Sequence, residues 1–70
     1  MLYNIRIKYA ASPVWPEWLD DYHRDELQAD LFYRRCVNDA LDGVYGEGVI
    51  KIQKLYRNKI VKSTEVIYAS

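Results

Sequence analysis

The sequence predicts a small α+β domain with the element order β-α-β-β, in which one long helix packs on one face of a three-stranded, antiparallel-type sheet. Three observations predict it. Residues 2–10 alternate between apolar and polar side chains, residues 15–40 carry an apolar stripe at helical spacing, and two β-rich stretches near the C-terminus flank a short turn. Seventy residues suffice for one small domain, so we expect residues 1–70 to fold as a single unit.

The first predicted element is a strand over residues 2–10. Tyr3, Ile5, Ile7 and Tyr9 fall on one face of this strand, and polar or charged residues dominate the other. A repeat of two residues is typical of a half-buried strand. Pro13 cannot donate a hydrogen bond to a neighbouring strand, so the strand has to end before it.

The second predicted element is a helix over residues 16–42. Pro16 suits a first helical position, and Gly43 suits the position just after a helix. The apolar stripe between them is interrupted once, at Asp25 and Glu26. A continuous helix would be about 40 Å long, against about 30 Å for a nine-residue strand. We therefore expect a bend or break within residues 20–25, with the longer piece on the C-terminal side.

The last predicted elements are strands over 49–57 and 60–68, joined by a turn at Asn58 and Lys59. We expect the last strand to lie between the other two, in a split β-α-β arrangement with a right-handed crossover. If Arg57 opposes Ile60, one face of the hairpin is the core face, and it includes Lys54. The opposite, open face then keeps a mixture of apolar and basic residues: Val49, Lys51, Gln53, Leu55, Arg57, Ile60, Lys62, Thr64, Val66 and Tyr68.

The charges are sorted along the chain although their sum is zero. Residues 16–43 carry eight acidic side chains against three arginines, and the rest of the chain is mainly basic. This distribution predicts a molecule with two electrically different sides.

No pattern in the sequence predicts catalysis, a metal site or a cofactor. Cys36 and His23 are the only cysteine and the only histidine, which excludes an internal disulfide and argues against a zinc site. Cys36 lies on the apolar stripe, where a free thiol behaves as a small hydrophobe. The glycines at 43, 46 and 48 precede a strand, whereas a phosphate-binding loop precedes a helix.

Two contact surfaces are predicted instead. An open sheet face that keeps apolar side chains among basic ones is typical of a binding surface. Leu27 and Leu31, with Arg34 beside them, form a second candidate surface on the outer side of the helix, for which harmless exposure is the competing interpretation. The partner-binding residues predicted on and around the sheet are Arg6, Lys8, Lys51, Leu55, Arg57, Lys62 and Tyr68.

These observations predict a non-catalytic protein-binding module, an inhibitor or adaptor that acts by covering a partner's surface and forms a homodimer. Small single-domain chains of this style are frequent among phage proteins that bind host targets. The alternative is a small nucleic-acid-binding protein that uses a basic sheet face with stacking tyrosines. A variant of the first hypothesis has the acids Glu17, Asp20, Asp21, Asp25 and Asp30 mimic phosphates. The chain has no apolar run long enough to span a membrane and only one cysteine, so we expect a cytoplasmic protein.

Overall fold

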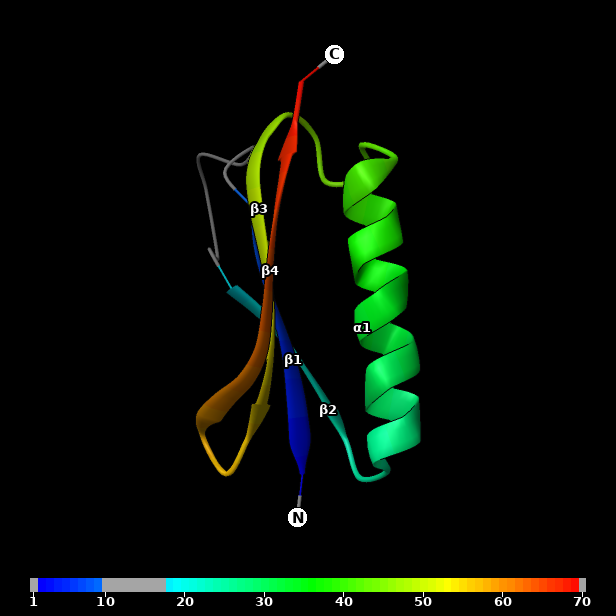
Figure 1. Cartoon of the computed structure of the whole chain (residues 1–70), viewed down its shortest axis with the longest axis vertical. Helices are drawn as coiled ribbons and strands as arrows, with labels where there is room; N and C mark the ends of the chain where they lie inside the picture. The colour runs from blue at the N-terminus through cyan, green and yellow to red at the C-terminus, as the bar shows by residue number, and fades with distance from the viewer. Residues whose placement is uncertain (1, 10–17, 70) are drawn as a thin grey trace.

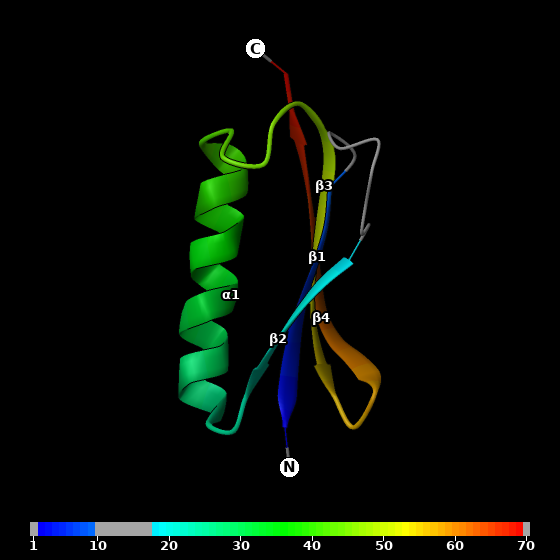
Figure 2. The same cartoon turned by 180° about the vertical axis from the view of Figure 1, so that it is seen from behind.

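A four-stranded antiparallel sheet carries one helix on one of its faces (Figure 1). The computed structural model describes residues 2–9 and 18–69. The strands are β1 (Tyr3–Tyr9), β2 (Trp18–His23), β3 (Gly48–Tyr56) and β4 (Lys59–Tyr68), and the helix is α1 (Glu26–Leu41). Their order in the sheet is β2-β1-β3-β4, so β2 and β4 are the two edges. Figures 1 and 2 view the sheet from these two edges, with the helix on one side and the open face on the other.

The core lies between α1 and the two central strands. Ile5 and Ile7 of β1 stand beside Ile52 and Ile50 of β3, because Ile7 pairs with Ile52 in the antiparallel register. The helix places three small side chains and one tyrosine ring against them. The buried helix residues are Ala29, Tyr33, Cys36 and Ala40. This confirms the predicted α+β class and the buried position of Cys36.

The predicted helix over 16–42 is wrong in its N-terminal part. Trp18–His23 forms β2, an edge strand that pairs antiparallel with β1, so the sheet has four strands and not three. Asp25 ends this segment as the N-cap of α1, and its side chain accepts a 3.0 Å hydrogen bond from the Leu27 amide. The expected break within 20–25 is therefore a change from strand to helix. The predicted helix start at Pro16 lies outside the described residues.

The predicted strand order is also wrong. The strand at 48–56, not the last strand, pairs with β1, and β4 lies at the edge. The reason is β2, which reverses the chain before the helix begins. As a result β3 runs antiparallel to β1 and can pair with it directly, and the split β-α-β unit consists of β2, α1 and β3 with β1 between the two strands.

The hairpin between β3 and β4 differs from the predicted register in two ways. Its turn is Arg57-Asn58, whose φ angles of 53° and 63° are those of a type I′ turn. Lys59 then opposes Tyr56, and Ile60 opposes Leu55. Val61 is an extra residue at a bulge, after which Lys62 opposes Lys54. The bulge turns Lys62, Thr64, Val66 and Tyr68 to the helix side of the sheet, where the prediction had put them on the open side.

The loop after α1 depends on Gly43. Its φ of +80° is favourable only for glycine, and a Cβ at this position would lie 2.5 Å from Cζ of Tyr68. The glycine therefore ends the helix and also makes room for the Tyr68 ring at the end of β4. This contact joins the C-terminus of the helix to the last strand.

Candidate functional site

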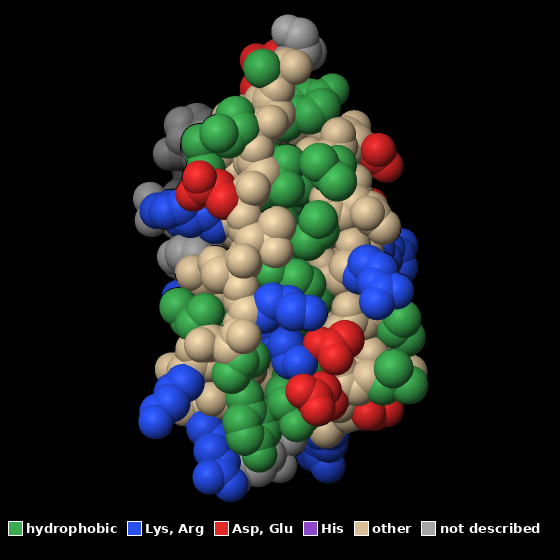
Figure 3. All heavy atoms as spheres, in the orientation of Figure 1, with side chains coloured by type: hydrophobic (Ala, Val, Ile, Leu, Met, Phe, Trp, Pro, Cys, Tyr) green, Lys and Arg blue, Asp and Glu red, His purple; other side chains and the backbone are tan. Residues whose placement is uncertain are grey.

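A groove runs between α1 and the edge strand β4 on the helix side of the sheet. One pocket of about 390 Å³ lies in it and is lined by Asp30, Tyr33, Arg34, Val37, Lys62 and Thr64. A second pocket, of about 360 Å³, shares Lys62 with the first and is lined also by Tyr3, Glu26, Lys54, Tyr56 and Val61. Figure 3 shows hydrophobic side chains gathered along this seam, with basic and acidic side chains in its middle. We call this feature the α1–β4 groove.

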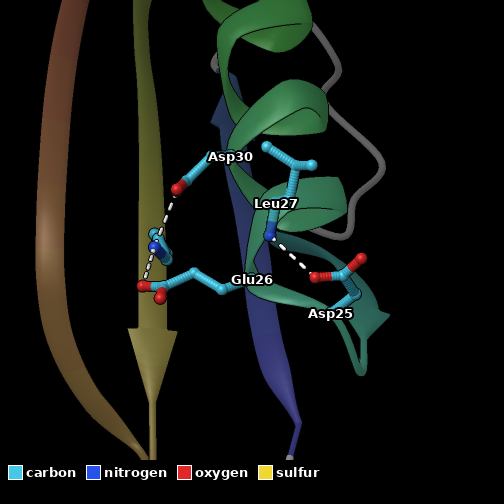
Figure 4. Close-up of polar contacts among 5 residues, drawn as sticks. Asp25, Glu26, Leu27 and Asp30 are labelled. Atoms are coloured by element: carbon cyan, nitrogen blue, oxygen red, sulfur yellow. Dashed lines mark hydrogen bonds and ion pairs between the residues drawn. The ribbon is translucent and has the colours of Figure 1, made fainter.

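The wall of the groove contains a buried ammonium group. Lys54 is only 5% exposed, and its Nζ donates hydrogen bonds to Asp30 Oδ1 at 2.6 Å and to Glu26 Oε2 at 2.9 Å (Figure 4). Glu26 and Asp30 lie one turn apart on α1, so both reach the same point on β3. Nζ also lies 5.3 Å from the centroid of the Tyr3 ring. This cluster fixes the first turn of the helix over the central strands.

The protonation states in this cluster are fixed by the same contacts. Burial favours the neutral amine, but the hydrogen bonds to Asp30 and Glu26 outweigh it and raise the pKa of Lys54 above 10.5. The hydrogen bond from Lys54 lowers the pKa of Asp30 below its ordinary value of 3.8. Lys54 is therefore a charged structural group at neutral pH, and not a nucleophilic amine.

The floor of the larger pocket carries two hydroxyl groups. Tyr33 Oη lies 2.5 Å from Thr64 Oγ1 and 3.3 Å from the backbone oxygen of Ile52. Because Tyr33 donates its proton to the Ile52 oxygen, the Thr64 hydroxyl donates to Tyr33 Oη, and both hydroxyl protons are used within the protein. Lys62 closes part of this pocket, because its Nζ lies 5.3 Å from the centroid of the Tyr33 ring.

The structure separates the residues predicted as one partner-binding surface. Arg6, Lys8, Lys51 and Leu55 lie on the open side of the sheet, as the alternation of β1 and β3 requires. Arg57 lies in the turn, with its guanidinium 5.4 Å from the ring of Tyr56. Lys62 and Tyr68 lie on the helix side, Lys62 in the groove and Tyr68 against the core.

The open sheet face mixes charges of both signs. Arg6 Nε lies 3.7 Å from Asp20 Oδ1, and Lys51 Nζ lies 3.9 Å from Glu65 Oε2. Asn4 also donates a 2.9 Å hydrogen bond to Asp20. Its apolar part differs from the prediction, because Ile67 takes the place of Val66 and Tyr68. Ile67 pairs with Val49 and is 73% exposed.

The second predicted surface lies along one side of α1. Leu27 and Leu31 are 63% and 48% exposed there. Arg34 follows at the i, i+4, i+7 spacing of one helix face and also lines the α1–β4 groove. This surface therefore adjoins the groove, and its role in binding stays a prediction.

The acids that the sequence groups together do not form one acidic face. Asp20 and Asp21 are neighbours in β2 and so point to opposite sides of the sheet. Asp25 caps the helix and Asp30 binds Lys54. Glu17 lies outside the described residues.

Cys36 and His23, the two residues considered as reactive groups, have different surroundings. Burial raises the pKa of the Cys36 thiol, which lies in the core. His23 Nε2 lies 3.4 Å from Asp21, and its ring packs 5.2 Å from Phe32. Within residues 2–9 and 18–69, no three His, Cys, Asp or Glu side chains are placed to hold a metal ion. In the same described part, no helix has the length and apolar composition that a bilayer span requires.

Sequence reasoning missed the α1–β4 groove. One signal for it was present: Lys54 occupies a core-facing position in the predicted register, and a lysine there requires carboxylates on the element that covers it. The side chains that β4 turns toward α1 depend on the bulge at Val61, for which the sequence has no comparable signal.

Comparison with known proteins identifies no relative. No protein-family model matches this chain, and neither a curated protein nor a solved structure matches it. The function therefore has to be inferred from the surfaces described above.

Proposed function

We propose that this domain is a non-catalytic protein-binding module, an inhibitor or adaptor that covers part of a partner's surface. One observation carries the proposal: the α1–β4 groove lies directly beside β4, a ten-residue strand at the edge of the sheet. An edge strand offers unpaired backbone groups to an extended segment of another protein, and an adjoining groove receives that segment's alternate side chains.

The two edges of the sheet differ in how they are protected. β2 is short, with six residues, and carries two adjacent aspartates. β4 is longer and contains no proline, and its bulge and Lys62 lie near the hairpin turn. Its other half, residues 63–68, carries one charge, Glu65, and the exposed Ile67. Short strands, charges and bulges are common protections against edge pairing, so β4 is the better docking edge.

The open sheet face supports the homodimer part of the proposal. Ile67 and Val49 form an exposed aliphatic pair at one end of this face, and Tyr22 is 59% exposed at the other edge. Sheet faces with exposed apolar side chains are commonly covered by a partner. We assign this face to a second copy of the chain, which leaves the α1–β4 groove for the other partner.

The alternative function, nucleic-acid binding, has less support from the geometry. A basic sheet face needs lysines and arginines that are available to phosphates. Here Lys51 lies beside Glu65, Arg6 lies beside Asp20, and Lys62 is on the other side of the sheet. The open face therefore lacks the concentrated positive charge that the alternative requires.

A capture experiment tests the proposal. The domain is immobilised through an added C-terminal tag and exposed to a lysate of the cells in which it is naturally made, with and without nuclease, at moderate salt. A variant with Arg34→Glu and Lys62→Glu reverses the groove charges, and a variant with Arg24→Glu and Arg35→Glu makes the same change in net charge outside the groove. We call them the groove-reversed variant and the matched control.

The wild type and the matched control are expected to retain the same protein after nuclease treatment, and the groove-reversed variant to lose it. Retention of nucleic acid alone would overturn the proposal. It would also be overturned if the groove-reversed variant retained everything that the wild type retains.

A further inference from the structure

We propose that the pocket between Arg34 and Lys62 receives a carboxylate side chain of a partner protein, carried by an extended segment that pairs with β4. The inference rests on the proposed protein-binding function and specifies the chemistry of the partner. It follows from the charges at the pocket, from the pocket's shape along the strand, and from the side chains that β4 itself presents.

The first argument is the excess of positive over negative charge at the pocket. Arg34 from the helix and Lys62 from the strand line the same pocket and are both exposed. Among the residues that the structure describes, neither has a carboxylate within ion-pair distance. Asp30 also lines the pocket, but Lys54 already binds its carboxylate at 2.6 Å. Asp30 also attracts both cations at longer range, but it forms an ion pair with neither, so an entering carboxylate would meet two exposed cations and one acid that already binds Lys54.

The second argument is the arrangement of donors at the pocket. The hydroxyls of Tyr33 and Thr64 form a short hydrogen bond there, in which Thr64 donates because Tyr33 donates to the Ile52 oxygen. Arg34 from the helix and Lys62 from the strand supply the donors that remain for an entering group. The pocket therefore offers charged donors from two sides, an arrangement that suits a carboxylate better than a neutral or positively charged group.

The third argument is the alignment of the two pockets along β4. A strand paired with β4 would point every second side chain into the groove, and such side chains are about 7 Å apart along the strand. The second pocket shares Lys62 with the first and contains the stacked rings of Tyr3 and Tyr56, whose centroids lie 4.7 Å apart. Charged residues also line this pocket, but its two rings and Val61 give it an apolar part that an apolar or aromatic side chain would contact. The structure thus favours a partner segment with an acidic and an apolar residue two positions apart.

A second copy of the chain is a poorer occupant of the groove. The β4 residues that face the helix side are Lys62, Thr64, Val66 and Tyr68, none of which carries a carboxylate. Glu65, the only acid of β4, points to the open side and lies beside Lys51. Pairing two copies edge to edge would bring a further lysine, and no acid, to the groove side.

The test uses designed peptides as the binding partner. The test peptide is a capped eight-residue threonine peptide with one glutamate and one leucine two positions apart, and its control has glutamine in place of glutamate. Binding is followed by amide shifts in the ¹H–¹⁵N spectrum of the wild-type domain. We expect shifts at Tyr33, Arg34, Lys62 and Thr64, and binding of the glutamine peptide about tenfold weaker, because one charge-assisted contact is lost.

Variants and a backbone-blocked peptide complete the test. The groove-reversed variant should lose about tenfold or more in affinity, and the matched control should bind like the wild type; retained spectral dispersion shows that each is folded. Two further versions of the test peptide are N-methylated, one at the odd-numbered and one at the even-numbered residues. Their affinities should differ, because only one of the two sets includes the amides that pair with β4.

Three results would overturn the inference: equal binding of the glutamate and glutamine peptides, no shift at millimolar peptide, or competition for the same amides by a single-stranded oligonucleotide. Lysate capture separates this failure from a failure of the proposed function. A protein that the wild type retains, but that the designed peptide does not displace, would support protein binding and refute the carboxylate site. If nothing is retained and no peptide binds, both are refuted.

Discussion

The Lys54 ammonium lies 2.6 Å from the Asp30 carboxylate, although Lys54 is almost fully buried and Asp30 is partly exposed. Loss of the carboxylate therefore affects Lys54 differently from the way in which loss of the ammonium affects Asp30. A carboxylate on the helix surface can return to water, whereas the ammonium against the sheet has little access to it. This asymmetry leads to the first prediction.

Removal of the two acids should lower the free energy of unfolding more than removal of the lysine. We expect the double variant Glu26→Gln and Asp30→Asn to lower the free energy of unfolding by about 3 kcal/mol, because it leaves a buried charge unpaired. Lys54→Met should lower it by about 1 kcal/mol or less, because both acids become hydrated and the methionine fills the same space. Urea denaturation at pH 7 measures both. Equal costs for the two variants would contradict the assignment of Lys54 as the buried partner.

The same cluster predicts how stability depends on pH. The lowered pKa of Asp30 means that its stabilising contribution is complete above 3.8 and is lost as the pH falls through the lower, folded-state value. The raised pKa of Lys54 means that its contribution is complete below 10.5 and is lost as the pH rises through the higher, folded-state value. The urea midpoint is measured against pH for the wild type and for Lys54→Met. The difference between the two midpoints should be constant around neutral pH and should decrease at both acidic and alkaline pH. A difference that is flat at acidic pH would be inconsistent with the ion pair.

The hairpin turn predicts a stabilising change. Arg57 and Asn58 both have positive φ, which is costly for arginine and is better served by Asn-Gly. The double variant Arg57→Asn and Asn58→Gly should raise the free energy of unfolding by about 1 kcal/mol. Asn58→Val should lower it by about 1 kcal/mol or more, because a β-branched residue is disfavoured at positive φ. Thermal unfolding of the three proteins checks the order, and a stable Asn58→Val variant would contradict the type I′ turn.

The contact between Gly43 and Tyr68 predicts a coupling between two distant positions. Gly43→Ala should lower the free energy of unfolding by about 2 kcal/mol, from positive φ and from the clash with the Tyr68 ring. In a Tyr68→Leu background Gly43→Ala should lower the free energy of unfolding by less, because the clash with the ring is gone and only the backbone strain remains. A double-mutant cycle by urea denaturation measures the difference. Additive effects would show that the ring and the glycine are independent.

Much of the fold could be predicted from local patterns. The alternation of residues 2–10 corresponds to β1, and the β-rich stretches correspond to β3 and β4. The C-terminal piece of the expected helix is α1. These predictions are confirmed because each pattern reflects the face that the element buries.

The remaining elements depend on contacts distant in sequence. Residues 18–23 fit the predicted helical stripe and show no two-residue alternation, so their strand conformation depends on the pairing with β1, which is distant from any local pattern. Asp25 interrupts the apolar stripe because it is the cap at which the helix begins. The bulge at Val61 exchanges the two sides of β4 for all residues after it, so that Lys62 and Tyr68 face the helix. No local residue pattern specifies this bulge. Lys62 and Tyr68 were therefore assigned to the wrong side of the sheet.

Solution mass by light scattering, at low and high salt and with added single- or double-stranded oligonucleotide, tests the proposed function most directly. We expect a dimer whose mass is unchanged by high salt and by either oligonucleotide, because the exposed aliphatic pair of Ile67 and Val49 anchors the surface assigned to the second copy and the charges on that surface are already paired within one chain. The variant Ile67→Lys, which places a charge on that surface, should be a monomer. A monomeric wild type whose mass increases with oligonucleotide at low salt, and returns to the starting value at high salt, would contradict the protein-binding function and favour a nucleic-acid-binding protein.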